Sequence, residues 1–421
     1  MLHIDEKNKV ITGYSYEKPD NYAKGFKFQE LDTGLTYYND SVGWVAFKEK
    51  NTLPIKKPNK QLNFKDGGIP ANASTCFHVS LFSNTKYYID SKIKTFTDIT
   101  GAVVEGVAWS SAWGDPVKIV DFYDGSFVVF TNVTTGTTFA KSCAIYRFSD
   151  INDATPSQVY LSSHDSNWAG AFGISSYTNG VNTTILAGEY GNTLNSKDLL
   201  LSLDDGQTYT VIKSTGDSTN VNNIHFHDVE IDPYSGILWV GQGDGVGDKK
   251  ISWSQTMGSS WTNLDPNLDS GVGLQPTLIM SFSERVLFGN DSGFAGLCAI
   301  DQPKEVYQWD NLLNSDPSLP YMFHMTRNRT IGGEPCYPQY PHKFGDLEGV
   351  FCESGHGQQF PAKIFMTGDG GNSFHVVGIT SFGGNNGLSI STVILGMDEN
   401  FIYTRRGNDG KILYAEKPNF N

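Results

Sequence analysis

The chain has 421 residues and a formal net charge of −14, with 31 Lys and Arg against 45 Asp and Glu. This balance argues against a protein that grips nucleic acid or inserts into an anionic membrane, because both need concentrated basic side chains. Aromatic residues make up 13% of the chain and 45 residues are glycine, a composition that excludes wholesale disorder and is typical of many short β-strands joined by turns.

We expect no targeting or membrane signal from this sequence. The first ten residues lack an apolar core, so no secretory signal is expected, and no apolar run is long enough to span a bilayer. The cysteines are odd in number, scattered and without a CxxC pair, which argues against a disulfide framework or a structural zinc site. We expect buried thiols, no metal and no cofactor. The five cysteines are Cys76, Cys143, Cys298, Cys336 and Cys352.

Residues 1–65 differ in composition from the rest and are predicted to form a small β-meander and a linker. The segment Gly25–Tyr38 alternates apolar and polar residues on both sides of the turn Asp32–Gly34, and Trp44 lies in a third short strand. A Lys-rich stretch from Lys48 to Lys65 follows and is typical of a linker.

The pattern F-x-E-x-D-T-G-x-x-Y, which begins at Phe28 and is followed by Trp44, resembles a segment common in tailed-phage tail, fibre and baseplate-associated proteins. The resemblance implies that this segment docks on other virion proteins. It also implies a chain made in the host cytoplasm and carried on the tail or capsid surface. A cellular protein with an incidental meander is the alternative, because short motifs mislead.

From about Ala71 onward a strand pattern recurs. A buried strand ends in Gly or a small polar residue, a second strand follows, and a polar turn leads into a strand that begins with an aromatic residue. The starts of the first strands lie roughly 40–65 residues apart, which suits one four-stranded sheet per repeat. These strands are Ser126–Phe130, Thr184–Gly188, Ile237–Gly241, Arg285–Gly289, Gly349–Cys352 and Thr392–Gly396.

This repeat predicts an all-β fold, a β-propeller of four-stranded blades over residues 66–421, preceded by the N-terminal β-meander. Single blades cannot bury both faces, so they stack radially around an axis. Six clear repeats and a shorter fragment at Cys76–Thr100 favour seven blades. Six blades is the alternative, if the fragment only completes the last blade.

A turn of the form Ser/Thr-x-Asp-x-Gly-x-x-aromatic occurs three times. The short carboxylate caps backbone N–H groups across a tight turn, and the glycine accepts a positive φ. The aromatic residue is expected to fill space between adjacent sheets. The residues are Ser202, Asp204, Gly206 and Tyr209; Ser254, Gly258 and Trp261, with Thr256 in place of Asp; and Thr367, Asp369, Gly371 and Phe374.

This turn resembles the Asp-box, or bacterial neuraminidase repeat, of sialidase-like propellers, and the resemblance implies a structural role on the rim. Sialidases of this kind share three arginines that grip the substrate carboxylate. This chain has six arginines, and none lies near Gly67–Pro70, where the family's early arginine motif would fall. We therefore expect no sialic-acid hydrolysis and assign no catalytic residue.

One strand carries polar side chains that are expected to face the axial channel. A period of two would place His225, His227 and Val229 on one face. It would place Phe226, Asp228 and Glu230 on the other. Two histidines at this spacing can hold a metal, but no third ligand is identifiable. Hydrogen bonding within the channel wall is the alternative to ligand contact. The candidate ligand-binding residues here are His225, His227, Asp228 and Asp244.

Three tryptophans, Trp109, Trp113 and Trp168, lie in Gly/Ser/Asp-rich loops, where exposed rings would stack on sugar faces. Packing between blades is the alternative. A glycosidase or lyase would need paired carboxylates, although a solvated turn residue is the commoner reading of each one. The carboxylates near strand ends are Glu189, Asp228, Glu230, Asp244 and Glu348.

Together these patterns predict a non-catalytic phage virion protein, a tail or head fibre adhesin whose propeller binds a host-surface ligand, expected to be a glycan. A depolymerase that cleaves surface polysaccharide and a purely architectural decoration protein are the alternatives. The expected partners are other virion proteins, a host-surface glycan or receptor, and further copies of the chain in a homo-oligomer.

Overall fold

Most of the predicted strands are described in the computed structural model of the chain. The described residues are 3–5, 10–13, 27–30, 36–39, 44–47, 58–66, 76–98, 101–134, 141–168, 173–191, 196–215, 225–243, 250–263, 276–290, 296–301, 323–324, 337–354, 363–371, 374–379, 390–406 and 411–420. The chain divides into two compact units, Met1–Lys56 and Lys57–Asn421.

Unit 1 contains one five-stranded sheet in the order β1-β2-β3-β4-β5. Strands β2 and β3 are parallel, whereas β3, β4 and β5 form the antiparallel meander that the sequence predicts. The five strands are β1 (His3–Asp5), β2 (Val10–Gly13), β3 (Lys27–Glu30), β4 (Thr36–Asn39) and β5 (Trp44–Phe47).

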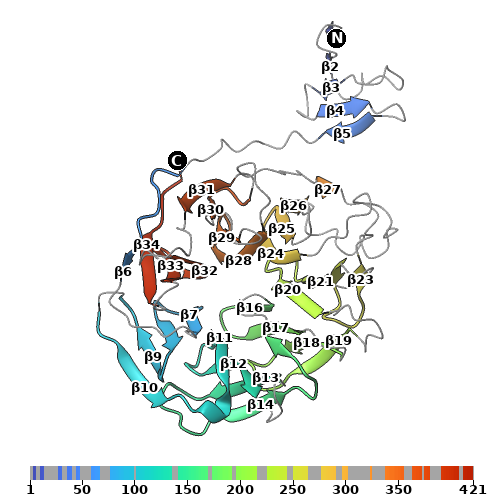
Figure 1. Ribbon diagram of the computed structural model, residues 1–421. Coiled ribbons are helices and arrows are strands. Elements are labelled where there is room, and N and C mark those ends of the chain that lie inside the picture. Colours follow the sequence, from blue (N-terminus) through green and yellow to red (C-terminus); the bar gives the residue numbers. More distant parts are fainter. Residues whose placement is uncertain are drawn as a thin grey trace. The chain divides into compact units, whose positions relative to one another are not determined.

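The described strands of unit 2 form seven sheets around a common axis (Figure 1). This arrangement confirms the predicted propeller of four-stranded blades. The described residues include one short helical segment, the 3-10 turn η2 (Ser111–Trp113). No helix among the described residues is long and apolar enough to cross a membrane.

The blades follow one another along the chain. Blade 1 contains β7 (Cys76–Val79), β8 (Lys86–Ile89), β9 (Lys92–Phe96) and β10 (Val104–Ala108), and blade 2 contains β11 (Asp115–Asp121), β12 (Phe127–Thr134), β13 (Lys141–Phe148) and β14 (Ser157–Leu161). Blade 3 contains β15 (Asn167–Trp168), β16 (Ile174–Thr178), β17 (Thr183–Tyr190), β18 (Asp198–Ser202) and β19 (Thr210–Ser214), and blade 4 contains β20 (His225–Ile231), β21 (Leu238–Gly243), β22 (Lys250–Ser254) and β23 (Thr262–Asn263). Blade 5 contains β24 (Pro276–Phe282), β25 (Arg285–Asn290), β26 (Gly296–Asp301) and β27 (Phe323–His324), and blade 6 contains β28 (Tyr337–Phe344), β29 (Glu348–Ser354), β30 (Lys363–Thr367) and β31 (His375–Ile379).

The seventh blade is closed by the beginning of unit 2. It consists of β32 (Ile390–Met397), β33 (Phe401–Arg406), β34 (Ile412–Glu416) and β6 (Lys65–Asp66), and β6 pairs antiparallel with β34. Residues 58–66, which we call the strap, also bond to blade 6 through Leu62 N and Val377 O, 2.6 Å apart. The ring is therefore sealed by pairing its first described segment with its last.

The structure corrects which strand of its blade the last predicted repeat begins with. Thr392–Gly396 lies in β32, the inner strand, whereas the other five predicted opening strands lie in second strands of their blades. The equivalent second strand of blade 7 is β33. Both strands bury apolar residues, such as Ile394 and Ile402, so their apolar character does not tell them apart. The fragment at Cys76–Thr100 belongs to a complete blade of its own.

The core lies between adjacent blades, because each sheet is buried on both faces. In β12, Phe127 and Val129 pack toward blade 1, whereas Val128 and Phe130 pack toward blade 3. All four side chains are fully buried. Two buried faces explain why such strands read as continuous apolar runs in the sequence rather than as an alternating pattern.

The three predicted turns share one hydrogen-bond pattern, and we call them corner turns. In each, the hydroxyl oxygen of the first residue accepts a bond from the backbone N–H of the glycine four residues later. The distances are 3.1 Å for Ser202 and Gly206, 2.9 Å for Ser254 and Gly258, and 3.0 Å for Thr367 and Gly371.

In two of the corner turns, the side chain at the third position accepts a hydrogen bond from the backbone N–H four residues later. Asp204 Oδ1 accepts from Thr208 N at 3.0 Å, and Thr256 Oγ1 accepts from Ser260 N at 2.9 Å. The threonine hydroxyl thus performs the same local bond as the carboxylate. Asp369 accepts a bond from the hydroxyl of the first residue of its own turn, at 2.8 Å.

Each corner turn packs against the preceding blade. A Cβ added to Gly258 would lie 2.6 Å from Ile212 Cβ in blade 3, and Trp261 Nε1 donates to Ile212 O at 3.2 Å. The ring of Tyr209 packs against Phe130 of blade 2, with centroids 6.3 Å apart. Gly206 and Gly371 likewise meet side chains of the blades before them, and Phe374 packs beside blade 5.

Candidate functional site

The two histidines predicted to face the channel lie side by side in β20. His225 Nε2 and His227 Nε2 are 2.8 Å apart, and His225 Nδ1 lies 3.2 Å from Gly191 O. Both side chains are buried, and the ring of Tyr190 lies 3.9 Å from that of His225. Within the described residues no group of three or more metal-binding side chains gathers. A ligand-binding role for these histidines stays a prediction.

The period-of-two assignment for this strand is wrong beyond His227. Phe226 pairs with Gln242 and Val229 with Val240, so β20 carries one extra residue, a β-bulge. A bulge turns the following side chains to the other face. Phe226 and Val229 consequently pack in the same cluster, rather than on opposite faces.

Register shifts occur at comparable places in other inner strands. They lie between Pro116 and Lys118 in β11 and between Gln339 and His342 in β28. Lys118 and His342 are the first paired residues after these shifts, whereas Asp228 lies within the irregularity of β20. These three inner strands surround the axis in Figure 1, and the charge of Lys118 acts on both Asp228 and His342.

Asp228 joins three blades through backbone groups. Its Oδ1 accepts from Gly173 N of the segment that enters blade 3 at 3.1 Å, and its Oδ2 accepts from Ile279 N of blade 5 at 2.6 Å. Burial raises the pKa of Asp228 to about 6, because the charged form loses hydration. With both oxygens engaged, Asp228 fastens neighbouring inner strands together.

Glu230 makes a second connection between the same blades. Its Oε2 accepts from Ser175 Oγ at 3.1 Å, and its Oε1 lies 3.5 Å from Ser281 N. Burial raises its pKa to about 7, while the charge of Lys343 acts in the opposite direction. Burial also raises the pKa of Glu189, which is fully buried and accepts a bond from Tyr160 Oη at 2.9 Å.

The candidate tryptophans pack against blade 2. The rings of Trp109 and Trp113 are 5.2 Å apart, and both lie within 6.0 Å of the Phe148 ring, measured between centroids. Trp168 is 1% exposed and its Nε1 donates to Ala144 O at 3.2 Å. Of the remaining candidates, Asp244 lies outside the described residues, and Glu348 lines an open pocket.

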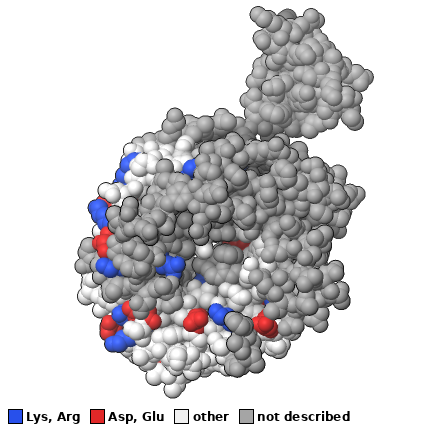
Figure 2. All heavy atoms as spheres, viewed as in Figure 1, with Lys and Arg blue, Asp and Glu red and all other residues white. Residues whose placement is uncertain are grey.

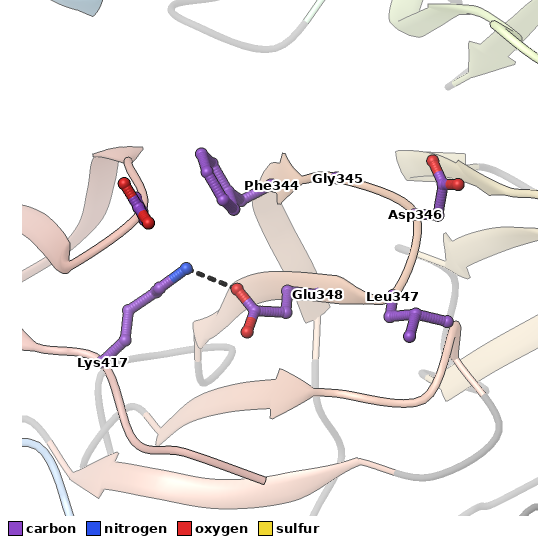
Figure 3. Close-up of a pocket in the computed structure, with 7 residues that line it drawn as sticks. Phe344, Gly345, Asp346, Leu347, Glu348 and Lys417 are labelled. Carbon is purple, nitrogen blue, oxygen red and sulfur yellow. Dashed lines mark hydrogen bonds and ion pairs between the residues drawn. The ribbon is translucent and has the colours of Figure 1, made fainter. Parts of the chain in front are cut away.

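That pocket, of about 500 Å³, lies where blades 6 and 7 meet (Figure 3). The turn between β28 and β29 forms one side, and residues from blade 7 form the other. Phe344 and Leu347 are 39% and 42% exposed. The lining residues are Phe344, Gly345, Asp346, Leu347, Glu348, Glu399 and Lys417.

Lys417 contacts both a carboxylate and an aromatic ring of the pocket lining. Lys417 Nζ donates to Glu348 Oε2 and lies 4.2 Å from the centroid of the Phe344 ring. Figure 3 shows the lysine pointing at the carboxylate, with Phe344 directly before the turn and Asp346 within it. Asp346 Oδ1 accepts a bond from Tyr234 Oη at 2.9 Å. Polar groups thus hold an exposed aromatic ring and acceptor oxygens in place.

Two features shape the turn that follows Phe344. Gly345 has a φ of +62°, with open space where a Cβ would lie, so glycine permits the tight turn at little cost. Leu347 O accepts from Gly370 N at 3.0 Å and ties the turn to the corner turn of its own blade. Of the pocket residues, the sequence pattern singles out Glu348 but not Phe344, Glu399 or Lys417.

The described charges on the face seen in Figure 2 are interspersed, with Lys and Arg among Asp and Glu. The pocket differs from this pattern, since its lining holds three carboxylates and one ammonium group. An apolar ring beside fixed hydrogen-bond acceptors is the usual composition of a small-molecule site.

Comparison with known proteins identifies the fold alone. No protein-family model matches the chain, and no curated protein matches its sequence. The GH74 xyloglucanase of Xanthomonas campestris matches at 12% identity and a TM-score of 0.52, over 85% of this chain and 54% of that one. YCF48 from Cyanidioschyzon merolae matches at 11% identity and a TM-score of 0.51, over 84% and 98%.

A sialidase of Trypanosoma rangeli also matches, at 14% identity and a TM-score of 0.38, over 76% of this chain and 57% of that one. The chain spans about half the length of the GH74 enzymes it matches. The protein therefore has a β-propeller fold, with glycoside hydrolases among its structural neighbours. Such a fold hosts many unrelated functions.

Proposed function

We propose that the propeller binds a surface glycan, without cleaving it, in the pocket between blades 6 and 7. The observation that supports this proposal is the exposed Phe344 ring beside the Glu348 carboxylate, which Lys417 holds in place. Aromatic rings pack against the C–H faces of sugars, and carboxylate oxygens accept hydrogen bonds from sugar hydroxyls.

A polysaccharide-cleaving enzyme is the second candidate. It is favoured by the presence of Asp346 and Glu399 in the same pocket as Glu348, because glycosidases use a pair of carboxylates. Against it, Glu348 is engaged by Lys417, which suits a fixed acceptor better than a group that must exchange protons during each turnover.

We also propose that the protein is a virion component, a tail or head fibre adhesin, whose unit 1 docks on other virion proteins. The support is the sequence of Phe28–Trp44, which resembles tailed-phage proteins and folds as the meander β3-β4-β5. The common bonds of the corner turns support their resemblance to the Asp-box. Mass spectrometry of purified phage particles tests the virion assignment, which fails if this chain is absent from them.

Binding of the full chain to a panel of immobilised host glycans tests the adhesive role. Phe344→Ala is expected to weaken binding at least tenfold, whereas Tyr123→Ala, which removes a ring that is 71% exposed on blade 2, is expected to leave it unchanged. Release of reducing sugar would favour the enzyme instead. Failure to bind any host glycan or host cell would leave only the architectural role.

A further inference from the structure

The pocket carries an excess of negative charge that its own lysine does not neutralise. Lys417 is paired with Glu348 and lies over the Phe344 ring. Asp346 and Glu399 are the other two charged lining residues, and both are exposed. Lys343 affects Asp346 from outside the lining, but its ammonium donates to Ser281 O. The pocket therefore presents carboxylates to a ligand.

The lining offers no arginine to an acidic sugar. Arg147 and Arg285, the arginines of blades 2 and 5 in the described residues, donate to backbone carbonyls of neighbouring corner turns. Two-point recognition of a carboxylate normally relies on a guanidinium fork. A net charge of −14 on the chain adds a general repulsion toward anionic ligands.

The Phe344 ring already contacts one cation of the protein itself. The Lys417 ammonium lies 4.2 Å from the ring centroid, within the range of a cation–π contact, and is at the same time paired with a carboxylate. A ligand ammonium that approaches the exposed part of the pocket would meet the same two kinds of partner, an aromatic ring and the carboxylates of Asp346 and Glu399.

We infer that the pocket selects glycans by charge and takes a sugar with a free amino group, in preference to its neutral N-acetylated counterpart and to acidic sugars. This inference rests on the proposed glycan-binding function and names the class of ligand for that site. The ligand's ammonium pairs with a carboxylate of the pocket rim, and the sugar ring packs on Phe344.

Calorimetric titration of the full chain with three oligosaccharides of equal length tests the inference. The probes are a glucosamine oligomer with free amines, its fully N-acetylated form and an oligogalacturonate, each at low and high salt below the pKa of the sugar amine. We expect the free-amine oligomer to bind at least tenfold more tightly than the N-acetylated one at low salt. High salt should narrow this gap, because it screens exposed charges, and the oligogalacturonate should not bind.

Two variants separate this pocket from the general negative charge of the chain. Glu399→Gln should reduce the preference for the free amine severalfold, whereas Glu105→Gln, on blade 1, should leave it unchanged.

Equal or tighter binding of the N-acetylated or acidic oligomer would overturn the inference. If such binding were lost in Phe344→Ala, the proposed function would stand without the inference. Binding of the free amine that neither Phe344→Ala nor Glu399→Gln alters would overturn both.

Discussion

The guanidinium of Arg285 in blade 5 donates a hydrogen bond to the carbonyl oxygen of Gly371 in the corner turn of blade 6, 3.2 Å away. Arg147 of blade 2 likewise donates to a corner turn of the next blade, to Asp205 O of blade 3 at 3.3 Å. These two arginines therefore support the joints between blades, which gives them a structural role in a chain with few arginines.

Arg285→Met should destabilise the propeller by about 1–3 kcal/mol. The substitution keeps much of the side-chain length but leaves a buried carbonyl without its charged donor, and Arg285 is only 4% exposed. Thermal unfolding followed by circular dichroism measures the loss. Lys92→Met is the matched control, because the Lys92–Glu105 pair is exposed and such pairs contribute roughly 0–1 kcal/mol. Equal effects of the two substitutions would contradict the assignment.

Gly258→Ala should destabilise the protein more than Gly236→Ala. Both glycines have a positive φ, +86° and +72°, so both substitutions carry backbone strain of about 1 kcal/mol. Only Gly258 would place its new Cβ 2.6 Å from Ile212, whereas nothing lies within 4 Å at Gly236. The difference in free energy of unfolding between the variants, about 1–3 kcal/mol, isolates the packing against the preceding blade, and identical values would refute it.

Asp204→Ala should cost about 1 kcal/mol of stability, the usual value of a lost capping bond, without changing glycan affinity. Burial acts to raise the pKa of Asp204, but hydrogen bonds from Thr208 and Ser202 outweigh it and hold the pKa below its ordinary value. Urea unfolding and glycan titration of the same sample measure the two effects. An unchanged unfolding midpoint with abolished binding would show that this corner turn contacts the ligand.

The stability of the propeller should fall as pH rises from about 4.5 to 7. Burial raises the pKa of Glu230 from 4.5 to about 7, so in this range the folded chain binds more protons at this site than the unfolded chain. The charge of Lys343, and those of Asp228 and Asp232, act on the same carboxyl group.

Glu230→Gln removes this titration, so the variant should lose less stability than the natural chain between pH 5 and pH 8. The difference is expected to be on the order of 1–2 kcal/mol, since one pKa unit corresponds to about 1.4 kcal/mol and the side chain is partly exposed. Urea unfolding at several pH values measures it. His342, whose pKa burial lowers to about 4, titrates in both proteins and cancels in the comparison. Parallel stability curves would contradict the prediction.

The corner turns show what was readable in the sequence. Ser202 and Gly206 are four residues apart and bond to each other, so a local pattern carries all the information for that turn. The alternation of strands and turns likewise predicts the blades. The β-bulge at His227 and Asp228 was not predictable in this way, because it depends on Gly173 and Ile279, which belong to other blades.

The pocket could be predicted from the sequence only in part. Glu348 was noticed as a carboxylate at a strand end, but its partner Lys417 lies 69 residues away and comes next to it only when blades 6 and 7 meet. The one local signal is the exposed turn Phe344–Leu347, with an aromatic residue, a glycine and an acid in succession. Nothing in that pattern indicates which residues of blade 7 complete the site.

The strap makes ring formation depend on residues at opposite ends of unit 2. Lys60 pairs with Glu416, 356 residues further along the chain, and β6 finds its sheet only when β34 exists. Contacts at such separation carry the greatest loop-closure entropy and form late. During synthesis, β6 must therefore remain without its sheet partner until the ribosome has delivered β34 and the six blades that precede it.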